Sequence, residues 1–261
     1  MTLLAVAVAG RGLVDPGAPV FGADDEALLR GGAAFETIRV YGGRAFLLDE
    51  HLARLRFSAA AVALPDPEEA AELAALVAGA APPDHVLRLY VTSELVVATA
   101  AALPSDLEEV RARGIALRSF EVGGPPPFLA GAKTTSYGIS LAARREAERG
   151  GADDAVLLGD GLVLEAATAN VWWRHGEELY TPAARPGVLP GVTRGLVRSF
   201  QDVREGDYPL ADLLGADEAF TTSSIREVMP VVSVDGRPIG DGRPGPTAAR
   251  LQGALRLRSA P

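Results

Sequence analysis

Among the 25 basic residues of this 261-residue chain there is one lysine, Lys133. Arginine provides all the others, but it stays protonated and cannot act as a neutral primary amine. A lysine with a lowered pKa can attack an aldehyde and form a Schiff base. Carbonyl capture is therefore the chemistry that Lys133 could supply. A codon bias against lysine would explain the scarcity without giving the one lysine any role.

Other residues could complete a site for a phosphate-bearing aldehyde. A turn at Gly191 precedes a predicted helix with Thr193 in its first turn, where exposed N–H groups favour an anion. Ser224 belongs to a cluster of hydroxyl residues that follows a predicted strand. The carboxylate of Glu165 could control the electronics of a ring. Each feature alone also fits an ordinary helix cap, surface loop or solvent-facing acid.

Composition and charge exclude several classes of protein. The net charge of −9 has no basic patch to offset it, which argues against a nucleic-acid partner. The chain has no cysteine, and His51, His85 and His175 are scattered, so we expect no metal site. The apolar N-terminal stretch is too short for a membrane span and has no basic leader. These observations are compatible with a cytoplasmic enzyme without a membrane anchor.

The pattern of elements predicts strands and helices in alternation, followed by a half rich in strands and turns. Residues 35–48 contain two β-rich runs joined by Gly42 and Gly43, which predicts a hairpin. Residues 49–64 have apolar side chains at helical spacing. Trp172 and Trp173 are neighbours in a predicted hairpin, so they should pack on opposite faces. The Gly/Pro stretch at 123–131 is the best candidate for a domain boundary.

Seven motifs, spread from about Ala23 to Pro246, occur in the order typical of one enzyme family. They are RGGAAFETIRV, HLARLRFSAAAVAL, KTTSYGISLAARREAERGGADDAVLL, GLVLEAATANVWW, LYTP, LPGVTRGLV and TSSIREVMPV. In this ordered set the chain resembles the class IV aminotransferases, which are pyridoxal-phosphate enzymes of fold type IV.

The resemblance implies an α/β (α+β) fold with two domains. A smaller N-terminal α/β domain would take residues 1–120, an interdomain loop 121–132, and a larger C-terminal pseudo-barrel domain 133–261, which binds the cofactor. Members of the family have active sites between the two domains at a dimer interface. The resemblance therefore also implies a homodimer.

The resemblance further implies pyridoxal 5′-phosphate (PLP) as the cofactor and assigns roles to individual residues. Lys133 would form the Schiff base and later move the proton between Cα and C4′. Glu165, 32 residues downstream, matches the carboxylate that pairs with the pyridine nitrogen. Tyr137 would contact the ring oxygen, although it follows the lysine by four residues where some branches have five. The residues expected at the phosphate are Arg54, Val192, Thr193 and Ser224.

Substrate choice within the family depends on the residues that hold the substrate. The better-known D-amino acid transaminases carry an arginine and a glycine where this chain has Ser93 and Glu94. Arg30 and Arg88 offer another carboxylate clamp, because an arginine can form two parallel hydrogen bonds with a carboxylate. Arg39 is a further candidate. The ordinary alternatives are a surface turn capped by Arg30 and an internal ion pair of Arg88.

These residues favour a ping-pong transaminase that moves the amino group of D-amino acids to a 2-oxoacid such as 2-oxoglutarate. Its donors could include (R)-amines. One alternative is 4-amino-4-deoxychorismate lyase, whose bulky substrate would fit beside the small residues 31–34. A second is a branched-chain L-amino acid transaminase. The intact Lys133 and Glu165 argue against a third, a protein that binds the cofactor without turnover.

Overall fold

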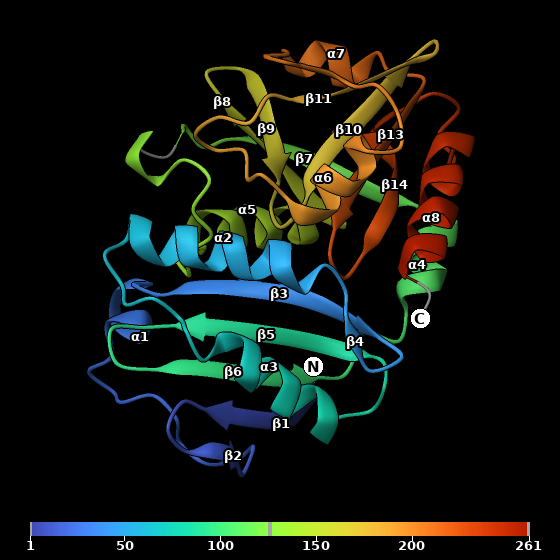
Figure 1. Ribbon diagram of the computed structural model, residues 1–261. Coiled ribbons are helices and arrows are strands. Elements are labelled where there is room, and N and C mark those ends of the chain that lie inside the picture. The colour runs from blue at the N-terminus through green and yellow to red at the C-terminus, as the bar shows by residue number, and fades with distance from the viewer. Residues whose placement is uncertain (1, 125–126, 260–261) are drawn as a thin grey trace. The chain divides into compact units, whose positions relative to one another are not determined.

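The computed structural model describes residues 2–124 and 127–259, and these residues form two compact units. The first unit runs to Pro104 and also takes Ala132–Tyr137 and Ser259. The second unit takes Ser105–Gly131 and Gly138–Arg258. Each unit has its own sheet, drawn in Figure 1.

The predicted domain ranges, 1–120, 121–132 and 133–261, stay a prediction, and the compact units divide the chain differently. Residues 105–120 belong to the second unit, because the strand β7 (Ile115–Glu121) pairs with strands of that sheet. Ala132–Tyr137 belongs to the first unit, because Thr134 forms a bridge with Ala34 there. Two residues of the predicted Gly/Pro break, 125 and 126, lie outside the described residues.

An antiparallel six-stranded sheet in the order β2-β1-β6-β5-β3-β4 forms the first unit. Gly42 and Gly43 both have positive φ and join the third and fourth strands, which confirms the predicted hairpin. The strands are β1 (Leu3–Val8), β2 (Gly12–Val14), β3 (Ala34–Tyr41), β4 (Arg44–Ala45), β5 (His85–Val91) and β6 (Val96–Ala101).

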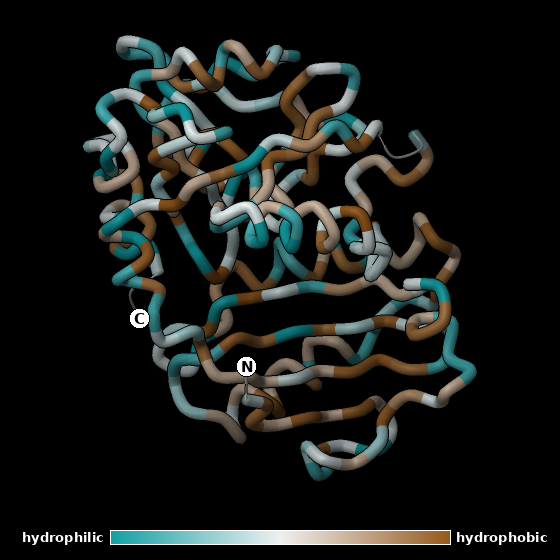
Figure 2. The backbone as a smooth tube through the Cα atoms, turned by 180° about the vertical axis from the view of Figure 1, so that it is seen from behind, coloured by the Kyte–Doolittle hydropathy of each residue, from teal (hydrophilic) through white to brown (hydrophobic). Residues whose placement is uncertain are grey.

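One face of this sheet is covered by helices and carries the main apolar core of the unit. These helices are α2 (Leu48–Ala61) and α3 (Ala70–Ala80), whereas the short helix α1 (Glu26–Arg30) has no buried residue. Leu55 of α2 and Val77 of α3 are fully buried against Ile38 and Leu89 of the strands. The apolar content of the strands is visible as brown segments in Figure 2. Residues alternate along β3, so its odd-numbered side chains lie on the opposite face.

A nine-stranded mixed sheet forms the second unit, in the order β12-β11-β10-β13-β14-β7-β8-β9, with β15 paired to β14. A bridge between Ala166 and Ala169 joins the end of β9 to the approach of β10, so the sheet curls into a half-barrel. The strands after β7 are β8 (Asp154–Gly159), β9 (Leu162–Ala166), β10 (Asn170–His175), β11 (Glu178–Pro182), β12 (Arg204–Gly206), β13 (Glu218–Ser223), β14 (Glu227–Val234) and β15 (Arg237–Pro238).

The two adjacent tryptophans of β10 belong to two different apolar layers of this unit. Trp172 stacks on Phe220 in the layer that packs against α6 and α8, whereas Trp173 stacks on Tyr180 in the interior layer. The prediction that they pack on opposite faces is thus confirmed. The helical segments are α4 (Leu107–Arg113), η1 (Pro127–Leu129), α5 (Gly138–Arg149), α6 (Val192–Arg198), α7 (Leu210–Leu214) and α8 (Pro246–Ser259).

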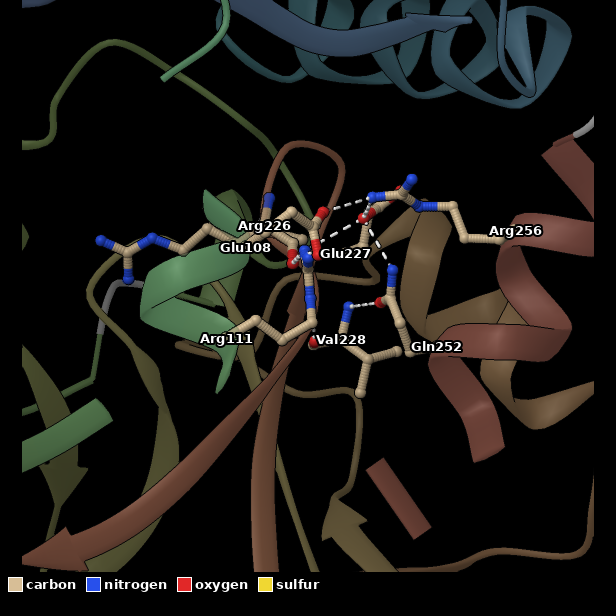
Figure 3. A network of polar contacts seen from close by, with 8 residues as sticks. Glu108, Arg111, Arg226, Glu227, Val228, Gln252 and Arg256 are labelled. Atoms are coloured by element: carbon tan, nitrogen blue, oxygen red, sulfur yellow. Dashed lines mark hydrogen bonds and ion pairs between the residues drawn. The ribbon is translucent and has the colours of Figure 1, made fainter. Parts of the chain in front are cut away.

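A buried acid, Glu227, ties α4 and α8 to the start of β14 (Figure 3). Its carboxylate accepts hydrogen bonds from Arg111 at 3.0 Å, Gln252 at 2.8 Å and Arg256 at 2.7 Å. Gln252 also accepts from the backbone N–H of Val228 at 3.0 Å. Because a buried charge is costly without partners, this network fixes the position of both helices on the sheet.

Within the described residues no helix is long and apolar enough to cross a membrane. The same residues contain no group of three or more acidic, histidine or cysteine side chains that could hold a metal ion.

Candidate active site

Lys133 lies in a short extended segment that pairs with the start of β3. Its carbonyl accepts from the N–H of Phe35 at 3.1 Å, and Thr135 donates to Ala33 at 2.8 Å. The N–H of Lys133 donates to the hydroxyl of Ser58, on α2, at 2.9 Å. The backbone of the lysine is therefore fixed by both the sheet and a helix of the first unit.

The lysine amine contacts two aromatic rings and a hydroxyl. Lys133 Nζ donates to the hydroxyl of Tyr137 at 2.9 Å and lies 4.3 Å from the centre of the Phe35 ring. Phe35 and Tyr137 meet edge to face, with their ring centres 5.4 Å apart. The spacing of four residues thus brings the predicted lysine and tyrosine together. The hydroxyl and the rings define where the amine lies.

Arg88 and Tyr90 share the sheet face that carries Phe35. Phe35 pairs with Tyr90, and Thr37 with Arg88, so these four side chains lie on one face in adjacent rows. The rings of Phe35 and Tyr90 stack, with centres 6.2 Å apart. Burial raises the pKa of Tyr90, and the charge of Arg88 opposes that rise. The structure therefore places Arg88 one row from the ring that touches the lysine amine.

The other two predicted substrate arginines have different surroundings. Arg30 ends α1 and pairs with Glu26 at 2.7 Å, with 70% of its side chain exposed. Arg39, on β3, is largely buried, and its guanidinium lies 4.9 Å from the centre of the Tyr41 ring. Arg30 would have to exchange Glu26 for a substrate carboxylate.

Gly31, next to Arg30, must be glycine for two reasons. It ends α1 with a φ of 67°, a backbone angle that residues with a side chain rarely adopt. An added Cβ would also lie 2.9 Å from the hydroxyl of Ser136. That hydroxyl donates to the Gly31 carbonyl at 3.1 Å. The RGG motif therefore helps to hold the segment that carries the lysine.

Arg54 is held by a buried acid, Glu36, that the sequence analysis did not single out. Its Nε and Nη2 donate to the two carboxylate oxygens of Glu36 at 2.7 and 2.8 Å. His51 Nδ1 lies 2.7 Å from the second oxygen. Burial alone would raise the pKa of Glu36, but the hydrogen bonds from Arg54 and His51 outweigh burial and lower it to about 2. Burial also lowers the pKa of His51.

The depressed pKa of Glu36 predicts a specific loss of stability in acid. A carboxylate whose folded pKa lies below its unfolded value contributes stability above the unfolded pKa and loses it as the pH falls through the folded pKa. The shift from 4.5 to about 2 corresponds to about 3 kcal/mol, lost between about pH 4.5 and pH 2. Urea unfolding at a series of pH values should show this loss in the parent chain and a smaller one in Glu36→Gln. Equal losses would contradict it.

Glu165, on β9, is oriented by two contacts from the second unit. Its Oε2 accepts from the side chain of Asn170 at 3.2 Å and from the N–H of Leu189 at 2.9 Å. Asn170 also donates to the carbonyl of Leu189 at 2.8 Å. Leu189 lies three residues before α6, so these bonds bring the carboxylate and the approach to that helix together.

The predicted anion-binding turn sits where α6 begins. Val192 and Thr193 are its first residues, and N–H groups of a first turn have no partner within their helix. Gly191 precedes them, and a Cβ there would lie 2.1 Å from the Asn170 side-chain oxygen, so this close approach requires glycine. Ser224 begins the turn between β13 and β14 and is partly exposed.

Three residues that the sequence analysis missed hold the predicted ones. They are Glu36, Ser58 and Asn170, which contact Arg54, Lys133 and Glu165. Only Glu36 had a signal in the sequence. It is an acid between Ala34 and Ile38, at an inward-facing position of an apolar strand.

Comparison with known proteins identifies the family. The model of the family described as "Amino-transferase class IV" matches residues 33–234. The chain therefore belongs to the class IV aminotransferases, and its two-unit α/β architecture is the fold-type IV fold. This confirms the predicted family and fold class.

Two relatives show the range of activities near this sequence. A D-alanine aminotransferase from Bacillus licheniformis is 29% identical over 256 residues, which cover 89% of each chain. A bifunctional aminodeoxychorismate lyase / D-amino acid transaminase from Mycobacterium tuberculosis is 30% identical over 260 residues, covering 86% of this chain and 89% of the relative.

Two solved structures have the same fold. A hypothetical aminotransferase from Mycobacterium tuberculosis, bound to α-ketoglutarate and pyridoxamine 5′-phosphate, has a TM-score of 0.88 at 26% identity, over 97% of this chain and 98% of that one. A fold IV-transaminase from Curtobacterium pusillum has a TM-score of 0.83 at 27% identity, over 98% of this chain and 99% of that one. Class IV aminotransferases use PLP as their cofactor, and the first of these proteins has also been solved with PLP bound.

The residues present fit that cofactor. Lys133 supplies a primary amine on a fixed backbone, and Glu165 supplies a carboxylate that Asn170 and Leu189 hold in one orientation. An amine for the aldehyde and an acid for the ring nitrogen are the two groups that PLP chemistry requires. Gly191, directly before α6, leaves no room for a side chain, because a Cβ there would meet Asn170.

Proposed function

We propose that this enzyme transfers the amino group of D-amino acids to a 2-oxoacid such as 2-oxoglutarate, with (R)-amines as a further class of donor. Two relatives whose names include D-alanine or D-amino acid activity support this choice. Arg88 carries the substrate side of the proposal, because it lies one row from the ring that touches the lysine amine. One site would serve donor and acceptor in turn, which gives ping-pong kinetics.

In this proposal different residues act on the aldehyde and on the ring nitrogen of the cofactor. PLP, when bound, supplies an aldehyde for the amine and a ring that accepts the electron pair released on deprotonation. Lys133 Nζ would hold the cofactor covalently through its aldehyde and, as a free amine, would take the proton from the substrate Cα. The hydroxyl of Tyr137 keeps that nitrogen in place between transfers. The carboxylate of Glu165 keeps the ring nitrogen protonated.

The phosphate would be bound by donors of both backbone and side-chain type. The proposed donors are Arg54, Ser224 and the N-terminal residues of α6, Val192 and Thr193. Guanidinium groups and helix N-termini both favour phosphate through charge and N–H geometry. Lys133 is left for the aldehyde alone.

A panel of amino donors tests the proposed reaction. The holoenzyme is mixed with one donor at a time, and loss of the visible absorbance of the lysine-bound cofactor reports the first half-reaction. We expect D-alanine and D-glutamate to react and 2-oxoglutarate to restore the absorbance. Faster reaction with L-valine or L-leucine would overturn the proposal in favour of a branched-chain L-amino acid transaminase.

The role of Arg88 predicts a selective change in KM. Arg88→Gln should raise KM for D-glutamate by about 10- to 100-fold, because a hydrogen bond to a charged group contributes about 1.5–3 kcal/mol. An (R)-amine without a carboxylate serves as the control and should keep its KM. The same measurement on Arg30→Gln tests the second proposed arginine. Equal KM values for the parent and Arg88→Gln would remove Arg88 from the substrate site.

The lyase is the second candidate, because one relative combines the lyase and transaminase activities. A lyase would release pyruvate and p-aminobenzoate from aminodeoxychorismate. Product release without amino transfer to 2-oxoglutarate would move the assignment to the lyase.

The homodimer and the cytoplasmic location stay predictions.

A further inference from the structure

Glu36 is an acid inside the apolar core of the first unit. It lies between Ala34 and Ile38 on β3, and all three side chains face the core beneath α2 and are buried. A carboxylate at such a position is costly unless its charge is paired and its oxygens are hydrogen-bonded. Its partners should therefore explain why the strand carries it.

The partners of Glu36 belong to the helix that follows the hairpin. Arg54 approaches side-on and donates to both oxygens through Nε and Nη2. His51, one turn earlier on α2, approaches the same carboxylate. An ionised carboxylate only accepts hydrogen bonds, so His51 Nδ1 carries the proton and donates. Three donors thus converge on one acid.

Two-point pairing fixes the plane of a guanidinium, which a single hydrogen bond does not. The guanidinium of Arg54 carries five N–H groups, of which the side-on contact with Glu36 takes one on Nε and one on Nη2. The orientation of the other donors is therefore set by Glu36. Glu36 neutralises the charge of Arg54, so what it adds for a bound anion is a fixed orientation of the N–H donors.

We propose that Glu36 is a positioning residue for the cofactor phosphate: together with His51 it holds the Arg54 guanidinium in the plane in which its remaining N–H groups meet the phosphate. This inference rests on the proposed role of Arg54 in phosphate binding. Glu36 touches neither cofactor nor substrate and acts through the arginine. His51 limits the rotation of the carboxylate by its own hydrogen bond.

The substitution Glu36→Gln separates positioning from charge. An amide has one oxygen, and its NH₂ group would face donors of Arg54 or His51. The guanidinium is therefore no longer held in one orientation, although a neighbouring negative charge no longer neutralises it. If the charge mattered more than the orientation, this variant would bind phosphate more tightly than the parent.

The test compares binding of PLP and of pyridoxal, which has the same aldehyde and ring but no phosphate, to the apoprotein. We expect Glu36→Gln to weaken PLP binding about tenfold, as for residues that orient the ligands of metal sites, and to leave pyridoxal binding within about twofold. His51→Gln should cause a smaller change of the same kind. Glu50→Gln, at an exposed acid of the same helix, is the matched control and should bind both compounds like the parent.

The phosphate role of Arg54 and the positioning role of Glu36 can be refuted separately. Arg54→Ala should lower the preference for PLP at least as far as Glu36→Gln does, and no change there would refute the phosphate role of Arg54. A change in Arg54→Ala without one in Glu36→Gln would refute the positioning role alone, as would tighter PLP binding. If circular dichroism shows that Glu36→Gln is unfolded, Glu36→Asp replaces it, because its shorter side chain keeps the charge and loses the two-point contact.

Discussion

Replacing Lys133 by alanine should abolish transamination. General acid–base catalysis by one residue contributes about 10²–10⁴-fold, and the covalent link to the cofactor is lost as well, so we expect a fall of at least about four orders of magnitude. The half-reaction with D-alanine, followed in a single turnover, measures this fall. The visible absorbance of the lysine-bound cofactor should also disappear.

Lys133→Arg is the informative control for this prediction. It keeps a positive charge at the position but offers no neutral amine, so it should be as inactive as the alanine variant. An active arginine variant would mean that residue 133 acts through its charge. The arginine variant should fold like the parent, because the contacts of residue 133 with Phe35 and Ser58 are made by its backbone.

Replacing Glu165 by glutamine should slow the same half-reaction by about 10²–10³-fold, the effect of removing one preorganised electrostatic group. The amide cannot keep the ring nitrogen protonated, so the ring would accept electrons less readily. Covalent capture by Lys133 should persist, because the aldehyde end is unchanged. The variant would therefore separate cofactor attachment from proton abstraction.

Glu165→Asp is the control for charge, since it keeps a carboxylate on a shorter side chain. We expect its rate to lie between those of the parent and the glutamine variant. A Glu165→Gln enzyme that reacts at the parent rate would show that Glu165 has only the structural role seen in its bonds with Asn170 and Leu189.

The elements whose signals are local could be predicted from the sequence. The Gly42-Gly43 hairpin and the opposed tryptophans follow from turn chemistry and strand alternation. Helix α8 was not predicted, although its buried residues Ala248, Leu251 and Leu255 have helical spacing and Pro246 suits its first position.

The parts of the site that depend on tertiary contacts could not be predicted. Nothing local in the sequence indicates that Glu36 of a strand meets Arg54 of a helix 18 residues later. The same holds for Arg88, whose row on the sheet depends on the register between β3 and β5. Spacing can suggest which residues do chemistry, whereas their supporting contacts are set by how the chain packs.

Whether Lys133 carries the cofactor can be measured directly by covalent labelling. The holoenzyme is treated with borohydride, which reduces the bond between lysine and cofactor to a stable secondary amine, and the digested chain is mapped by mass spectrometry. Because the chain has one lysine, the N-terminal amine is the other site that could react. We predict the phosphopyridoxyl group on Lys133 alone. A label on the N-terminal amine, or none on Lys133, would contradict the account.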